Sequence, residues 1–272
     1  MSALPLPENW ADRAITIDVI GAGGTGSQLA DQLASLECTM RSLGHPGFRV
    51  TLHDGDHVER SNVGRQRFTH HDVGQMKVIP LVHRINGFYD LQWEASPLHV
   101  DPARAQDHLR ALHDDGLVIT CVDKAAFRAE LGRRCRNNRT GALWLDLGNG
   151  DAQAQCVLGH LGRPSEGVRI PNILDLFPEL AHMQREDEET PSCSAEVAIR
   201  RQPWPINRLV AISAMEMLWN LMRTGRLEYH GQFLQTRPFS TTPLAVDEAH
   251  WAMLGYDAAA SGKKARKRRA SA

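Results

Sequence analysis

A run of glycines near the N-terminus constrains this 272-residue chain more than any other feature. It reads Gly21-Ala22-Gly23-Gly24-Thr25-Gly26, follows the β-branched segment 14–20 and precedes a helical pattern at 27–43. A strand, a glycine turn and a helix in this order present backbone N–H groups to a phosphate without Cβ obstruction. The turn therefore predicts a nucleotide-binding fold, although NAD binding and a purely structural turn remain open at this point.

Strand-like and helical segments keep alternating after the glycine turn. In chain order they are strand 48–52, helix 76–86, strand 92–100, helix 102–113, strand 117–121, helix 125–136 and strand 143–147. Such alternation produces a mainly parallel sheet with helices on both faces, whose ligands lie at the carboxyl ends of the strands. We therefore predict a doubly wound, Rossmann-like α/β fold.

The pattern loosens beyond residue 149. The expected elements there are a strand at 155–160, a short helix at 175–184, a long helix at 206–224 and a strand-like stretch at 227–236. The final stretch predicts a β-rich C-terminal extension of the sheet.

Composition excludes several classes of protein. Apolar residues make up 42% of the chain and the formal net charge is −1, so no overall field draws it to nucleic acid or membrane. Neither a signal peptide nor an apolar stretch of about 18 residues occurs, which favours a cytoplasmic protein with no membrane span. Five cysteines without a Cys-x-x-Cys pair argue against a disulfide framework and a structural zinc site.

The chain ends in a basic tail. Residues 263–269 contain six Lys or Arg side chains, and a block of like charge is by default a solvated tail. Nucleic acid is therefore an unlikely partner except through this tail. The predicted organisation is an N-terminal extension at 1–13, one α/β domain at 14–256 and the tail at 257–272.

A second block decides which nucleotide is expected. It starts with Asp54-Gly55-Asp56, passes through Ser61-Asn62 and Arg65-Gln66 to Lys77, and is followed by Cys121-Val122-Asp123. This order resembles the ThiF, MoeB and ubiquitin-activating superfamily, whose pattern continues from the glycine loop to a strand that ends in Cys-x-Asp. The resemblance spans about residues 14–236, and the later part looks most similar to the ThiF-family branch of the plasmid-borne PRTRC cassette.

The resemblance implies an adenylating enzyme that uses ATP and Mg²⁺. Its substrate would be the C-terminal carboxylate of a small ubiquitin-like protein that ends in glycine. Attack on the α-phosphate builds charge that cationic side chains and a metal ion can stabilise. The implied roles are ribose binding for Asp54 with Asp56 beside it, phosphate binding for Asn62, Arg65, Gln66 and Lys77, and Mg²⁺ binding for Asp123.

Two of the implied roles have a competing interpretation. Asp123 could instead cap the helix that follows it. Cys193 lies in a polar loop at about 185–205, where the superfamily places a crossover segment and a reactive cysteine. Its thiolate could accept the acyl group as a thioester, but the acidic run 186–189 does not favour a thiolate, so an inert cysteine remains open.

Three further features bear on function. Many relatives hold zinc between two Cys-x-x-Cys pairs, and this chain has neither pair. A methionine-rich stripe in the helix at 206–224 could pack on the sheet or on a second copy, so a homodimer remains open. An inactive nucleotide-binding scaffold for a plasmid-maintenance partner and an NAD-dependent oxidoreductase remain as alternatives.

Overall fold

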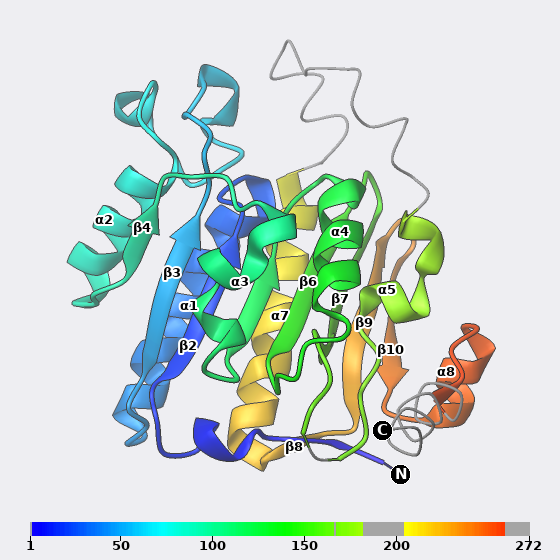
Figure 1. Cartoon of the computed structure of the whole chain (residues 1–272). Helices are drawn as coiled ribbons and strands as arrows, with labels where there is room; N and C mark the ends of the chain where they lie inside the picture. The colour runs from blue at the N-terminus through cyan, green and yellow to red at the C-terminus, as the bar shows by residue number, and fades with distance from the viewer. Residues whose placement is uncertain (1, 166, 182–203, 259–272) are drawn as a thin grey trace.

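The computed structural model describes residues 2–165, 167–181 and 204–258. Its main feature is a sheet of eight strands (Figure 1). Across the sheet the strands are β10 (Phe239–Ala245), β9 (Tyr229–Thr236), β7 (Gln153–His160), β6 (Leu143–Asn149), β5 (Leu117–Thr120), β2 (Ile15–Ile20), β3 (Phe48–His53) and β4 (Glu94–Ser96). Pairing is parallel from β6 to β4 and antiparallel at β7, β9 and β10. The predicted mainly parallel α/β sheet with a β-rich C-terminal extension is confirmed.

Helices cover both faces of this sheet. In Figure 1, α4 lies in front of the sheet and α7 behind it, and α7 packs against α1. The α-helices are α1 (Gly24–Ser42), α2 (Val78–Tyr89), α3 (Ala105–His108), α4 (Ala125–Cys135), α5 (Ile173–Leu176), α7 (Trp204–Thr224) and α8 (Glu248–Met253). The 3-10 turns are η1 (Glu8–Trp10), η2 (Arg60–Asn62), η3 (His70–Asp72), η4 (Pro102–Arg104), η5 (Arg110–Leu112) and η6 (Pro178–Ala181), and β1 (Leu4–Pro5) pairs with β8 (Arg226–Leu227).

The central strands are nearly continuous apolar runs because both of their faces lie in the hydrophobic core. All residues of β2 and β5 are buried, as expected for strands that helices cover on both faces. Val19, Ile119 and Leu145 are fully shielded from solvent. Removal of this apolar surface from water, at roughly 25 cal/mol per Å², is the main force that fixes the strand order and the positions of the strand ends.

The structure corrects several predicted boundaries. The helix predicted at 102–113 is wrong: η4, α3 and η5 replace it, because Leu109 is buried with an extended backbone at φ −103° and ψ 108°. The strand predicted at 92–100 shortens to β4, and α1 begins three residues before the predicted start at 27. None of the described helices has the length and apolarity needed to cross a bilayer.

Candidate nucleotide site

The glycine turn joins β2 to α1 through backbone contacts that exclude side chains. Gly21 has φ +98°, and a Cβ there would lie 2.9 Å from the carbonyl oxygen of Cys121. A Cβ on Gly26 would lie 1.8 Å from the carbonyl oxygen of Gly21. These two glycines are therefore required by the fold itself, because β2, β5 and α1 meet at van der Waals distance.

Gly23 and Gly24 differ in what surrounds them. A Cβ on Gly24 would lie 2.6 Å from Nδ2 of Asn207 in the first turn of α7, whereas a Cβ on Gly23 would meet nothing within 4 Å. The turn is thus closed on the α7 side and open at Gly23. An open approach to backbone N–H groups at a helix N-terminus is the geometry that a phosphate needs.

Asp54 ties the end of β3 to the glycine turn. Its Oδ2 accepts a hydrogen bond from the backbone N–H of Ala22 at 2.6 Å, and its Oδ1 accepts one from the N–H of Asp56 at 2.8 Å. The residue is 9% exposed. The carboxylate is therefore fixed beside the turn, where the ribose of a bound nucleotide is expected in this kind of fold.

Lys77 and Asp56 form an ion pair at the same edge of the sheet. Lys77 Nζ lies 2.8 Å from Asp56 Oδ2, and His99 Nε2 lies 3.5 Å from Asp56 Oδ1. Burial alone would raise the pKa of Asp56, but the hydrogen bond and charge of Lys77, with His99 and Lys124, hold that pKa below its usual value. The Lys77 ammonium is largely buried, so its charge acts in a poorly screened setting.

The segment that contains Asn62, Arg65 and Gln66 lies against the first turn of α1. The backbone N–H of Arg67 donates to Ser27 Oγ at 3.2 Å. Asn62 Oδ1 accepts from the N–H of Glu59 at 2.8 Å, so this amide holds the turn η2 together. Its role in the structure is to shape the segment that carries Arg65.

Several buried amide groups near the turn have no hydrogen-bond partner within the described residues. These atoms are Gln28 Nε2, Gln66 Oε1 and Asn207 Nδ2. Buried polar atoms in native proteins are nearly always satisfied, so each such atom calls for an explanation. A polar ligand on the glycine turn is the explanation that fits their position.

Arg65 and Asp123 lie close enough to interact electrostatically. Burial lowers the pKa of Arg65, and the carboxylate of Asp123 opposes that shift. Asp123 is exposed, and α4 starts at the N-cap Lys124 without a side-chain capping hydrogen bond, so the alternative capping role of Asp123 is not observed. No three His, Cys, Asp or Glu side chains cluster as metal ligands within the described ranges. An exposed single carboxylate nevertheless suits Mg²⁺, which takes most of its ligands from phosphates and water.

A buried ion pair supports the turn that carries Asp123. Arg128 donates from Nε to Asp146 Oδ1 at 2.8 Å and from Nη2 to the carbonyl oxygens of Val122 and, at 3.1 Å, Leu147. The Asp146 side chain is 1% exposed and that of Arg128 is 9% exposed. This network fixes the backbone immediately before Asp123.

Sequence reasoning missed a group of polar side chains behind the glycine turn. Thr25 Oγ1 lies 3.0 Å from both Asn149 Oδ1 and Asn207 Oδ1, and Asn149 Nδ2 donates to Asn207 Oδ1 at 2.9 Å. Asn149 ends β6 at the carboxyl edge of the sheet, and that position was a usable signal. Asn207 offered no such signal, because only the fold brings α7 beside the turn.

Three of the described cysteines are poor nucleophiles. Burial raises the pKa of Cys135 to about 11 and that of Cys156 to about 12, and it also raises the pKa of Cys121. Their thiols stay protonated at neutral pH. Cys193, like most of the predicted loop at 185–205, lies outside the described residues, as do residues 259–272 of the basic tail.

The sequence is similar to that of a known family and of several curated proteins. The sequence profile of the ThiF family matches residues 12–251. Ubiquitin-like modifier-activating enzyme 5 of Gallus gallus is 27% identical over 235 residues, covering 80% of this chain and 53% of that protein. The enzyme of the same name from Oryza sativa subsp. japonica is 29% identical over 160 residues, 55% of this chain and 35% of that one. The chain thus spans about half or less of these relatives.

Solved structures show the same fold. A crystal structure of PaaA has a TM-score of 0.59 at 17% identity, over 85% of this chain and 64% of that one. Escherichia coli MccB crystallised with ATP has a TM-score of 0.57 at 14% identity, over 85% of this chain and 63% of that one.

Proposed function

The chain belongs to the ThiF family, and on that premise we propose that it uses ATP and Mg²⁺ to adenylate the C-terminal carboxylate of a small ubiquitin-like protein. The observation that carries this proposal is the open glycine turn at Gly23, to which Asp54 is bonded through the N–H of Ala22, together with the interacting pair Arg65 and Asp123 and the buried ammonium of Lys77. Support also comes from the enzymes named ubiquitin-like modifier-activating enzyme 5 and from MccB crystallised with ATP.

In the proposed complex, the triphosphate lies over the glycine turn with the ribose at Asp54. Lys77 would exchange its contact with Asp56 for a phosphate oxygen, and Arg65 would bind a second oxygen through its planar guanidinium. Asp123 would hold Mg²⁺, which supplies additional positive charge to the phosphates. Asn62 would shape the segment that carries Arg65, and Gln66, whose Oε1 has no partner among the described residues, would contact the nucleotide.

The proposed reaction is a single substitution at the α-phosphorus. One oxygen of the partner's ionised carboxylate forms a bond to that phosphorus, the bond to the bridging oxygen breaks, and pyrophosphate leaves with the bonding pair. No proton has to move, so the protein needs no general base for this step. Its contribution is to align the reactants and stabilise charge on the pyrophosphate through Lys77 and Arg65.

We propose Cys193 as the acceptor of the acyl group in a second step. Its thiolate would attack the carbonyl carbon, AMP would leave, and a thioester would result. The partner's C-terminal glycine, the PRTRC relationship, the homodimer and the cytoplasmic location belong to the same proposal. The glycine and the PRTRC relationship derive from the resemblance of the sequence motifs to the superfamily, the homodimer from the methionine-rich stripe at 206–224, and the location from the sequence-based expectation of no signal peptide.

Pyrophosphate exchange into ATP tests the first step. The assay combines the protein with small ubiquitin-like proteins that end in glycine, and we expect exchange that depends on both ATP and the carboxylate. Asp123→Ala should abolish exchange, and Cys193→Ala should leave it intact because the thiol acts after adenylation. Undiminished exchange in Asp123→Ala would remove the metal assignment.

An inactive scaffold is the second candidate, because ATP binding alone satisfies the geometry of the glycine turn. Binding of ATP without any exchange, across the tested partners, would favour that candidate. Tighter binding of NAD than of ATP in a calorimetric titration would favour the oxidoreductase.

A further inference from the structure

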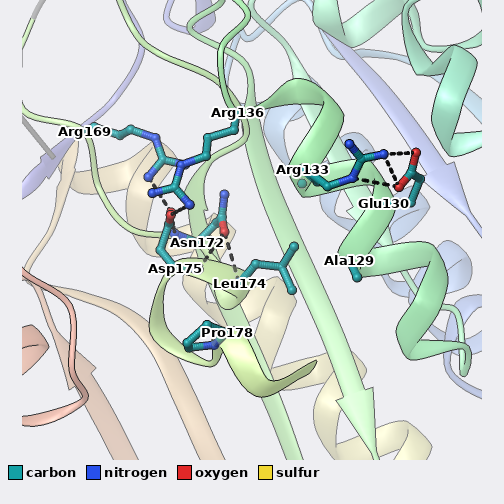
Figure 2. Close-up of a pocket in the computed structure, with 10 residues that line it drawn as sticks. Ala129, Glu130, Arg133, Arg136, Arg169, Asn172, Leu174, Asp175 and Pro178 are labelled. Carbon is teal, nitrogen blue, oxygen red and sulfur yellow. Dashed lines mark hydrogen bonds and ion pairs between the residues drawn. The ribbon is translucent and has the colours of Figure 1, made fainter. Parts of the chain in front are cut away.

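A cavity of about 510 Å³ opens between α4 and the segment around α5, on the flank of α4 (Figure 2). We call it the α4 pocket. Arg136, in the turn after α4, lies beside Arg169 on one side of the opening, and Arg133 on α4 lies on the other side (Figure 2). None of these residues belongs to the glycine turn or its surroundings, so the nucleotide site does not account for the cavity.

On one side of the α4 pocket, two arginines converge on one buried carboxylate. Arg169 Nη1 bonds to Asp175 Oδ2, and Arg136 Nη1 lies 3.5 Å from Asp175 Oδ1 (Figure 2). The Asp175 side chain is 2% exposed and already accepts from the backbone N–H of Asn172, whereas the Arg136 side chain is 55% exposed. A separation of 3.5 Å is beyond normal hydrogen-bond length, so the donors of Arg136 remain available to a ligand.

On the other side, two more arginines share a second carboxylate. Arg133 makes a bidentate contact with Glu130, and Arg134 Nε bonds to Glu130 Oε1 at 2.7 Å. The Glu130 side chain is 27% exposed and that of Arg133 is 64% exposed. Arg133, Arg136 and Arg169 line the α4 pocket with two recessed carboxylates, which leaves an excess of one positive charge at its rim, on a chain whose net charge is −1. Arg134, which shares Glu130, lies outside the lining.

The base of the α4 pocket is apolar. Ala129, Leu174 and Pro178 contribute carbon surface there. A Cβ on Gly132 would lie 2.4 Å from Leu174 Cδ1, so the glycine lets this leucine pack closely on α4. Phe, Tyr and Trp are absent from the lining, so the pocket has no platform on which a nucleic-acid base could stack. A cationic rim over an apolar base fits the side chains of an acidic, partly apolar polypeptide.

We propose that the α4 pocket binds an acidic segment of the protein partner and holds the body of that partner while its C-terminus reaches the glycine turn. This inference rests on the proposed function. Arg133 is eight residues along α4 from Ala125, which is about 12 Å of helix, and α4 begins directly after the Asp123 turn. About four extended residues span that length, so a short C-terminal tail connects the two sites.

Fluorescence anisotropy with a labelled peptide tests the docking site without ATP or exchange. The probe is a fluorescein-labelled, glutamate-rich peptide with interspersed leucines, and its control has every glutamate replaced by lysine. We expect the glutamate peptide to bind at low salt and the double variant Arg133→Glu/Arg136→Glu to weaken binding at least about tenfold. Arg133→Gln/Arg136→Gln, which removes charge without adding repulsion at Glu130 and Asp175, should also weaken binding.

Arg223→Glu/Arg226→Glu provides the matched control, because both side chains are exposed, equally spaced and far along the chain from α4. This control should bind the glutamate peptide as the wild type does, and thermal melts establish that each variant is folded. The inference would be overturned if the control variant lost as much affinity for the glutamate peptide as the α4 variants, or if neither α4 variant lost affinity. Tighter binding of the lysine peptide or of a single-stranded oligonucleotide than of the glutamate peptide would also overturn it. Because the readout needs no ATP, it fails or succeeds independently of adenylation.

Discussion

Gly23→Ala separates nucleotide binding from folding more cleanly than any other change in the glycine turn. The backbone at Gly23 has φ −78° and ψ −145°, which lies outside the regions that L-residues prefer, but a Cβ there would meet nothing within 4 Å. The folded protein therefore has room for the methyl group, and the cost of the substitution is confined to backbone strain. We expect the free energy of unfolding to fall by about 1–3 kcal/mol, the usual cost of a residue held in a sparsely populated backbone conformation.

ATP binding should weaken for a separate reason. The methyl group would occupy the open space through which a phosphate approaches the backbone N–H groups. Loss of even one hydrogen bond to a charged group costs about 1.5–3 kcal/mol, so the dissociation constant for Mg-ATP should rise at least about tenfold. Isothermal titration calorimetry measures the affinity, and urea unfolding measures the stability of the same samples.

Two further glycine variants complete the design. Gly87→Ala adds a methyl group at an exposed position in α2 where nothing lies within 4 Å, so it should raise stability by about 0.5–1 kcal/mol and leave ATP affinity unchanged. Gly26→Ala places a Cβ 1.8 Å from a backbone oxygen and should strongly destabilise the fold. Wild-type ATP affinity in Gly23→Ala would refute the assignment of the glycine turn as the phosphate site.

Three other outcomes follow from buried polar groups. Arg128→Met leaves the carboxylate of Asp146 buried without its cation, so the free energy of unfolding should fall by about 3–5 kcal/mol in urea titrations; a loss under about 1 kcal/mol would contradict this. Burial lowers the pKa of His230 to about 4, so the unfolded state binds more protons between pH 6.5 and 4, and stability should decline as pH falls through that window, less so in His230→Gln. The Asn207→Ala variant should weaken ATP binding in calorimetry, because its amide holds Thr25 at the start of α1; unchanged affinity would limit Asn207 to packing.

Local patterns were sufficient to predict the parallel part of the sheet. Strands β2 and β3 are short β-rich runs followed directly by a glycine after Ile20 and an acid after His53, and these residues mark the carboxyl edge of the sheet. The helix expected at 102–113 is broken into η4, α3 and η5, because Leu109 in its middle is buried with an extended backbone. Tertiary packing outweighed a preference of a few tenths of a kcal/mol per residue.

The candidate site could be assembled from sequence only where its residues follow strands or belong to one motif. Asp54, Lys77 and Asp123 met this condition, since each lies near the end of a predicted strand or the start of a helix. The contact of Asn207 with Gly24 joins residues far apart in the chain and depends on how α7 packs on α1. The α4 pocket likewise required the fold, because Arg136 meets the buried carboxylate of Asp175 only where α5 packs beside α4.

The most direct measurement follows oxygen from the carboxylate into the products of ATP. The small protein that supports pyrophosphate exchange is labelled with ¹⁸O at its C-terminal carboxylate, and hydroxylamine is added to release the activated acyl group. Attack on the α-phosphorus predicts one ¹⁸O in AMP and none in pyrophosphate, detected by mass spectrometry. Label in inorganic phosphate, with ADP as the other product, would show that the terminal phosphorus is attacked and would contradict adenylation.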